Sequence, residues 1–218
     1  MPGVVARRSS ARLGPSGVWA AYPARVRGRT LPGDDVADFT RAIAGLREVR
    51  LRPEVRVTEV PAPQRIAPHA VALSAEVTVA DTDEDLASGR FVLLHDPSAP
   101  EPWEGVWRAV TFTTAKLEPE LAADPSLGEV GWAWLLDSLR THDVGFTAAA
   151  GTVTRVVSER FGGLADHQTT VEVEVRASWT PLDDHVGPHF LAWSDLLCTI
   201  AGLPPLPEGV VALPGTRR

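Results

Sequence analysis

The 218-residue sequence has a single cysteine, Cys198, and lacks any long run of apolar residues. One cysteine cannot form a disulfide within the chain, which fits a reducing compartment. A helix that crosses a bilayer needs about 18 or more apolar residues in succession, and no segment provides them. The N-terminal region is basic but lacks the apolar stretch of a secretory signal. We therefore expect a cytoplasmic protein without a membrane span.

Lysine is nearly absent, and the first 33 positions lack acidic residues altogether. Lys116 is the only lysine; residues 1–33 hold six arginines, and all 28 acidic residues follow them. We predict a disordered basic leader at 1–33, because a polar segment rich in Pro, Gly and Arg cannot repay the entropy of ordering. Residues 34–218 are predicted to form one domain with an extended C-terminal tail. Its acidic balance disfavours nucleic-acid binding, except through the leader.

Hydrophobic residues make up 44% of the chain and charged residues 22%, as in ordinary globular domains. Three segments show helical spacing of apolar residues: 35–50, 127–140 and 188–202. The second follows Asp124 and Pro125, which we interpret as the cap and the first helical position. Three helices are therefore expected.

Five segments are predicted to be strands, because they alternate in polarity or are short and continuously apolar. These are residues 69–79, 89–95, 103–117, 151–163 and 169–181. The segment 52–68 contains four prolines, which exclude a central strand or a helix, and it is interpreted as extended chain. Short connections require antiparallel neighbours. The prediction is an α+β fold of order α-β-β-β-α-β-β-α: a mostly antiparallel five-stranded sheet packed by helices, with much of its other face wet.

Residues 89–112 combine several side chains that can carry chemistry. His95 and Asp96 form an acid/base pair in sequence, and Trp103, Glu104 and Arg108 follow closely. The span lacks a nucleophile, a metal-ligand set or a phosphate loop in a recognisable spacing. "HDPSAPEP" is also typical of a turn between two apolar strands. We interpret the span as a hairpin turn with core residues; the alternative is a site for an enzyme or a small-molecule binder.

Two other groups of residues raise the question of metal or thiol chemistry. His185 and His189 are four residues apart, but Gly187 and Pro188 between them disrupt the helical geometry of a zinc pair. Cys198 lies among apolar residues of a helix, where a thiol acts as a small hydrophobe. No phosphate-binding loop precedes a helix. The sequence predicts no catalytic residue, metal or cofactor.

Trp132 and Trp134 mark the second predicted helix as a contact element. Their neighbours are apolar, so both are expected in the core or at an interface. The polar sides of the strands at 151–163 and 169–181 provide a second candidate surface. Paired opposite charges are the simpler interpretation of these strands.

Several phrases together resemble a known family. They are "RPEVRVTEVPAPQRIAP", "VALSAEV", "GRFVLLHDP", "WEGVWR", "DPSLGEVGWAWL", "GTVTRV", "EVRASWTP" and "LLCTIAGLPPLPEGV". In this order they are similar to a family of actinobacterial proteins with a domain of unknown function, over residues 36–213. The resemblance implies no reaction, ligand or catalytic residue. Family genes often lie near one for a ribonuclease D-like protein, which implies a link to RNA metabolism. The element order is also similar to that of type III secretion chaperone-like proteins, which dimerise and hold partner segments.

Our functional prediction is therefore a non-catalytic protein-binding module, an adaptor or chaperone-like domain, with a homodimer as one form. The first alternative is an enzyme or small-molecule binder near His95, Asp96, Glu104 and Arg108. Such a site requires these side chains to converge in a pocket. The second alternative is an accessory protein in RNA metabolism that acts through the basic leader.

Overall fold

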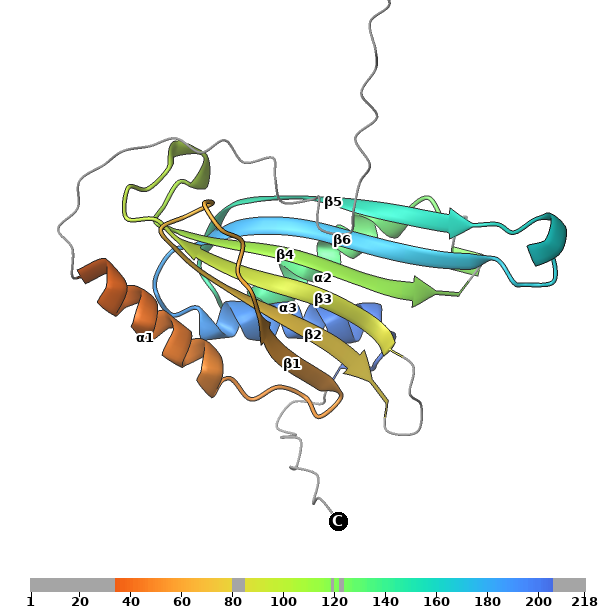
Figure 1. The fold of residues 1–218 in the computed structure, drawn as a ribbon, viewed down its shortest axis with the longest axis horizontal. Helices are drawn as coiled ribbons and strands as arrows, with labels where there is room; N and C mark the ends of the chain where they lie inside the picture. Colours follow the sequence, from red (N-terminus) through yellow and green to blue (C-terminus); the bar gives the residue numbers. More distant parts are fainter. Residues whose placement is uncertain (1–33, 80–84, 119, 122–123, 206–218) are drawn as a thin grey trace, which may run out of the picture.

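The computed structural model describes residues 34–79, 85–118, 120–121 and 124–205. The predicted leader at 1–33 lies outside the described residues. The described chain forms an antiparallel sheet of six strands in the order β1-β2-β3-β4-β6-β5 (Figure 1). The strands are β1 (Val55–Val60), β2 (His69–Thr78), β3 (Asp85–His95), β4 (Trp107–Leu117), β5 (Phe146–Ser158) and β6 (Thr170–Pro181).

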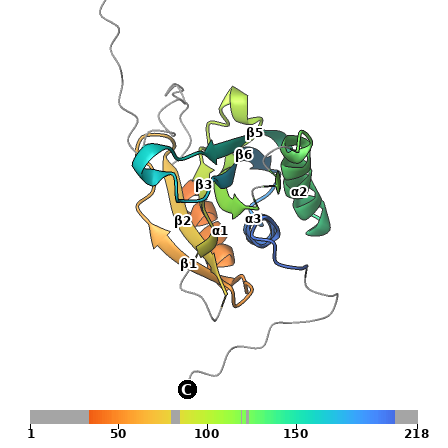
Figure 2. The same cartoon turned by 90° about the vertical axis from the view of Figure 1, so that its right-hand side faces the viewer.

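Three helices, α1 (Asp34–Glu48), α2 (Leu127–Thr141) and α3 (Gly187–Ile200), cover the same face of the sheet (Figure 2). α3 lies between the other two and packs on the central strands, and α2 packs on β5. We call the helix side the covered face and the other side the open face. No helix in the described ranges is long and apolar enough to cross a bilayer.

The main core lies between the covered face and α3. Phe91 of β3 packs edge-on against Trp179 of β6 and Phe190 of α3. Two buried indoles satisfy their N–H groups within this layer: Trp193 donates to Thr113 Oγ1 at 3.1 Å, and Trp179 donates to a ring nitrogen of a histidine in α3. Buried tryptophans need such partners, so these bonds fix how α3 sits on the sheet.

A second, smaller core lies on the open face at one end of the sheet. Trp103, in the short 3-10 helix η2 (Glu101–Trp103), packs with Val92, Leu94 and Val110. Partly buried residues of the segment 60–70 complete the cluster. β3 is therefore apolar on both sides, which explains the continuous apolar run in its sequence.

The prediction of five strands was wrong by one, because β1 lies within the segment expected to be extended chain. Pro53 and Pro61 flank this strand without interrupting it. At an edge, β1 pairs with β2 along one side, from Val55 opposite Val77 to Val60 opposite Ala72. An edge strand tolerates nearby prolines because it gives up fewer ladder hydrogen bonds than a central strand does. The other five strands and the three helices are confirmed.

Two local details also differ from the prediction. α2 begins at Leu127, two residues later than expected, because the Asp124 carboxylate accepts hydrogen bonds from the backbone N (2.8 Å) and Oγ (2.7 Å) of Ser126. These bonds lower the pKa of Asp124. β5 begins at Phe146, five residues before the predicted start, and contains a bulge between Thr147 and Ala150.

Candidate functional site

The five residues singled out in the span 89–112 do not share one pocket. His95 lies opposite Trp107 across β3 and β4, and both side chains face the helices. Arg108 lies opposite Leu94 and points to the open face, since successive strand residues alternate. The sheet therefore separates the His95 imidazole from the Arg108 guanidinium.

Asp96 and Glu104 shape the turn between β3 and β4. The Asp96 carboxylate accepts hydrogen bonds from the backbone N (2.9 Å) and Oγ (2.7 Å) of Ser98. Glu104 has a left-handed backbone with φ of 57° and accepts a hydrogen bond from Thr147 Oγ1 at 3.0 Å. Both carboxylates therefore form hydrogen bonds typical of a turn between two strands, rather than the hydrogen bond to His95 that an acid/base pair would require.

Arg108 is a buried cross-link between three strands. Its Nη1 donates to the Ala148 carbonyl at 2.9 Å and to Thr180 Oγ1 at 3.1 Å, and its Nη2 donates to Ser178 Oγ at 2.6 Å. Ala148 lies in the bulge of β5 and has a positive φ of 48°. Arg108 thus holds the irregular start of β5 against β6 and β4.

His95 belongs to an aromatic stack that fastens α1 to the sheet. Its ring centroid lies 4.1 Å from that of Trp107 and 5.8 Å from that of His69. Phe39 of α1 stacks on His69 at 5.3 Å, and His69 Nε2 lies 3.2 Å from the Asp35 carboxylate. Burial, and then the electrostatic effect of the neighbouring His69, lowers the pKa of His95 below its ordinary value.

The other titratable groups weighed from the sequence serve packing. Trp179 Nε1 donates to His189 Nδ1 at 3.0 Å, and burial lowers the pKa of His189 to about 4. Cys198 is buried, which raises its thiol pKa to about 11. His185 lies in the loop before α3. Across the described residues, no group of three or more His, Cys, Asp or Glu side chains is placed to hold a metal ion.

The tryptophans chosen as contact candidates are largely used inside the fold. Trp132 and Trp134 are partly buried against the main core. Gly151 of β5 makes room for Trp132: a Cβ there would lie 2.6 Å from a carbon of its ring. Trp103 is buried, and its carbonyl accepts a hydrogen bond from Thr180 Oγ1. Only part of the two α2 indoles is available to a partner.

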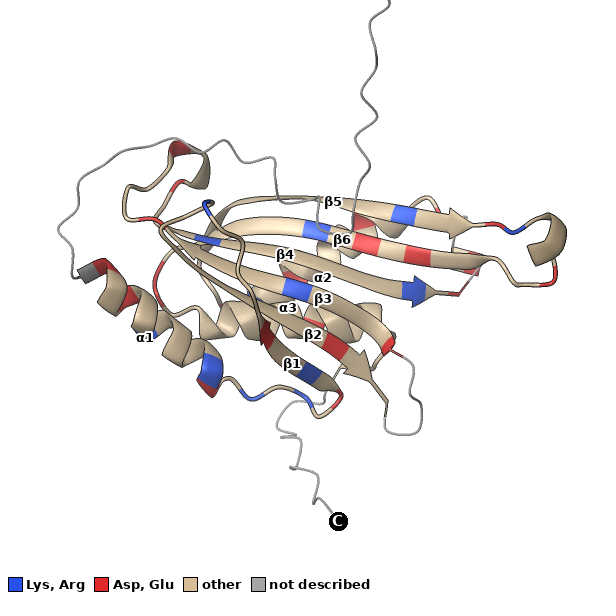
Figure 3. Ribbon diagram, in the orientation of Figure 1, with Lys and Arg blue, Asp and Glu red and all other residues tan. Residues whose placement is uncertain are grey.

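Away from the second core, the open face carries charges of both signs on neighbouring strands (Figure 3). Arg176 is paired with Glu174 at 2.5 Å, and its guanidinium lies 5.2 Å from the centroid of the Phe112 ring. Lys116 lies opposite Glu172 in the register of β4 and β6. This face has the paired charges expected of a wet sheet surface, rather than a field of one sign.

Exposed apolar side chains gather instead on the hairpin of β5 and β6. We define the β5–β6 arm as residues 157–171, because β4 ends opposite Val171 and the hairpin continues beyond it (Figure 1). Val157, Phe161 and Leu164 on this arm are 49%, 77% and 56% exposed. Sequence reasoning missed the arm, although "RFGGL" places two large apolar residues around a glycine turn.

The fold defines the class of protein: an α+β domain whose six-stranded antiparallel sheet is covered on one face by three helices. The chain belongs to the family described as protein of unknown function (DUF3000), whose model matches residues 35–211. The prediction that the chain belongs to a family with a domain of unknown function is therefore confirmed, and the match begins within α1. No curated protein and no solved structure matches the chain.

Proposed function

We propose that this domain is a protein-binding module whose contact surface is the β5–β6 arm together with the edge strand β5. The observation that carries the proposal is the arm itself. It extends past the neighbouring strand and presents Phe161 at 77% and Leu164 at 56% exposure. Large apolar side chains left in water on a projecting element are typical of interaction sites.

The energetics of burial support this role. Covering one large apolar side chain contributes about 1.5–3 kcal/mol, and aromatic residues dominate the energy of many interfaces. Phe161 and Leu164 frame the 3-10 turn η4 (Gly162–Leu164), and Arg160 donates to the Gln168 carbonyl below it. The turn is thus held by its own bonds, which limits the entropy lost on binding.

The edge strand next to the arm offers backbone hydrogen bonds as well. β5 is 13 residues long and, within the described residues, pairs with β6 alone. A partner strand that adds to this edge gains main-chain bonds, while its side chains contact the arm. A second copy of the chain, joined edge to edge, is one such partner. A client segment held in the cytoplasm, as by a chaperone-like adaptor, is another.

The experiment is affinity capture of the tagged full chain from its native lysate, with mass spectrometry of bound proteins. It compares wild type with Phe161→Ser and Leu164→Ser. Leu182→Ser is the matched control, since Leu182 is 63% exposed but lies at the far end of the same hairpin. We expect each arm variant to lose the partner about tenfold or more, and the control to retain it.

Light scattering of the same variants separates the two kinds of partner. A homodimer that dissociates only in the arm variants identifies a second copy. A monomeric wild type with a captured client identifies a different protein. Equal capture and equal mass for all four proteins would refute the proposed contact surface.

A further inference from the structure

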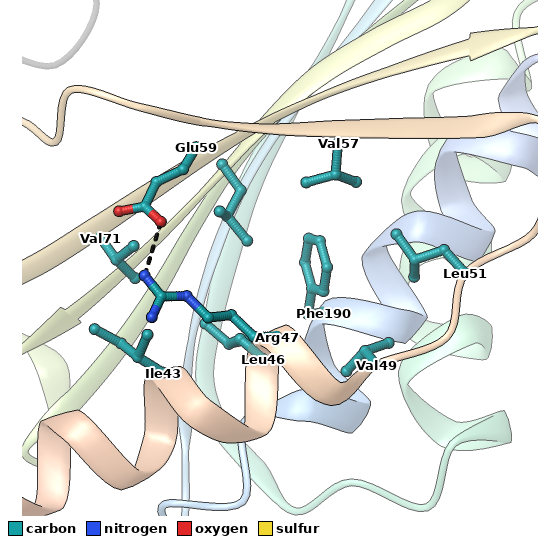
Figure 4. A pocket seen from close by; sticks show the side chains of 10 residues that line it. Ile43, Leu46, Arg47, Val49, Leu51, Val57, Glu59, Val71 and Phe190 are labelled. Carbon is teal, nitrogen blue, oxygen red and sulfur yellow. Dashed lines mark hydrogen bonds and ion pairs between the residues drawn. The ribbon is translucent and has the colours of Figure 1, made fainter.

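The structure contains an apolar pocket far from the β5–β6 arm. It lies between α1 and the strands β1 and β2 and has a volume of about 160 Å³ (Figure 4). Ile43 comes from α1, Val57 from β1, Leu51 from the segment between them, and Phe190 from α3. The interior is therefore almost entirely aliphatic and aromatic.

The only charged side chains of this pocket form an ion pair. Arg47 Nη2 lies 3.1 Å from Glu59 Oε2, and Figure 4 shows this pair bridging α1 and β1. Both side chains are more than half exposed, so their pairing contributes little and separates at low cost. A dry apolar cavity of about 150 Å³ holds one benzene-sized group. The pocket therefore fits one leucine- or valine-sized side chain from an occupant that passes between these charges.

The chain itself leaves the body beside this pocket. After α3, Leu203 N donates to the Cys198 carbonyl at 2.9 Å. Arg52 Nη1 then donates to the Pro204 carbonyl at 2.8 Å. Arg52 directly follows Leu51, which lines the pocket. The C-terminal segment therefore starts at a fixed point next to the opening.

That segment has the composition that the pocket requires. Residues 206–213 read "LPEGVVAL" and include the large apolar residues Leu206, Val210, Val211 and Leu213. The family match extends to residue 211, so most of the segment belongs to the domain. A tether of a few residues holds its end at an effective concentration of about a millimolar. At that effective concentration, weak apolar contacts are sufficient to keep the segment bound in the pocket.

We propose that the C-terminal segment 206–213 inserts an apolar side chain into the pocket between α1 and β1, as an internal ligand of the domain. The segment then ties α1 to the edge strand β1. This occupancy does not depend on the function proposed for the β5–β6 arm.

Disulfide trapping in the full chain tests the proposal. One cysteine replaces Arg47 or, in a second series, Glu59, both exposed at the pocket. Another replaces each of residues 208–213 in turn. Native Cys198 is retained, since it is buried and its thiol pKa is raised to about 11. Arg140→Cys on α2 is the matched control: Arg140 also ends a helix, is about two-thirds exposed and pairs with an aspartate.

Under mild oxidation we expect an intramolecular disulfide between the pocket and at least one tail position. It should form about tenfold or more faster than with the Arg140→Cys control. Rates equal to the control at all six tail positions, in both series, would overturn the proposal. A disulfide found only between two chains would overturn it too, and would assign the pocket to a second copy.

Discussion

Replacing Gly89 by alanine tests how closely α3 lies on the sheet. Gly89 is in the middle of β3, opposite Ala75 and Thr113. A Cβ at this position would lie 2.5 Å from the Phe112 carbonyl oxygen and 2.8 Å from Cζ2 of Trp193. One obstacle is backbone and the other is a ring fixed by its hydrogen bond, so neither moves aside easily.

The expected cost follows from these distances. Overpacking a core costs about 1–3 kcal/mol, and two contacts below 3.0 Å place this site in the upper half of that range. The lower unfolded-state entropy of alanine returns about 0.4–1 kcal/mol. We expect a net loss of about 2 kcal/mol, or roughly 4–8 °C in Tm for a chain of this size.

The assay is urea unfolding followed by tryptophan fluorescence, with Gly45→Ala as the matched control. Gly45 lies within α1, and no atom would approach its Cβ within 4 Å. The control should therefore gain about 0.5–1 kcal/mol from helix propensity. If both variants shift stability in the same direction, or if Gly89→Ala is neutral, the packing of α3 on β3 derived above is incorrect.

Two further predictions concern buried polar groups. Replacing Arg108 by Met removes three hydrogen bonds and should lower the free energy of urea unfolding by about 3 kcal/mol. The surface control Arg140→Met should change it by less than about 0.5 kcal/mol. Equal effects of the two substitutions would contradict the role of Arg108 as a cross-link between strands. In the folded protein the pKa of His189 is about 4, below its ordinary value of 6.5. The unfolded state therefore binds the proton first as the pH falls. Between pH 6.5 and pH 4 the free energy of unfolding should decrease by up to about 3 kcal/mol. Urea unfolding at pH 7.5 and at pH 4.5 should show a smaller decrease in stability for His189→Gln than for the wild type. An equal decrease in the two proteins would refute the conclusion that His189 causes this pH dependence.

The sequence predicts most of the fold because its signals are local. The alternation in 171–179 specifies the buried side of β6, from Val171 to Trp179, and the structure buries it. Helical spacing locates α1 and α3, although Val36 at the start of α1 is 54% exposed. β1 was missed because its flanking prolines were weighed as if the strand were central. Whether a strand lies at the edge of the sheet depends on the order of the strands, and the local pattern of apolar residues carries no information about that order.

The candidate site was less accessible from the sequence, because register is a tertiary property. His95 and Arg108 are 13 positions apart around a turn, and only the pairing of Leu94 with Arg108 shows that they lie on opposite faces. The stack of His69 on His95 likewise depends on the register of β2 and β3. The sequence shows Phe161 and Leu164 as two large apolar residues near a turn. It does not show that the β5–β6 hairpin extends past the end of β4, which is what leaves both side chains exposed.

The two edges of the sheet differ in a way that links both proposals. β1 has six residues, is flanked by Pro53 and Pro61, and lies beside α1 and the pocket assigned to the C-terminal segment. Short length and nearby prolines are the usual means of protecting an edge from unwanted pairing. β5 has 13 residues, of which Arg155 alone is charged, and contains no proline. Besides Arg155, β5 has one such device, the bulge between Thr147 and Ala150, which lies at the end away from the β5–β6 arm. A long edge strand with few such features is open to pairing with another chain. The lighter protection of β5 from Ala150 onward, in a sheet that protects β1, favours the β5–β6 side as the surface that meets another chain.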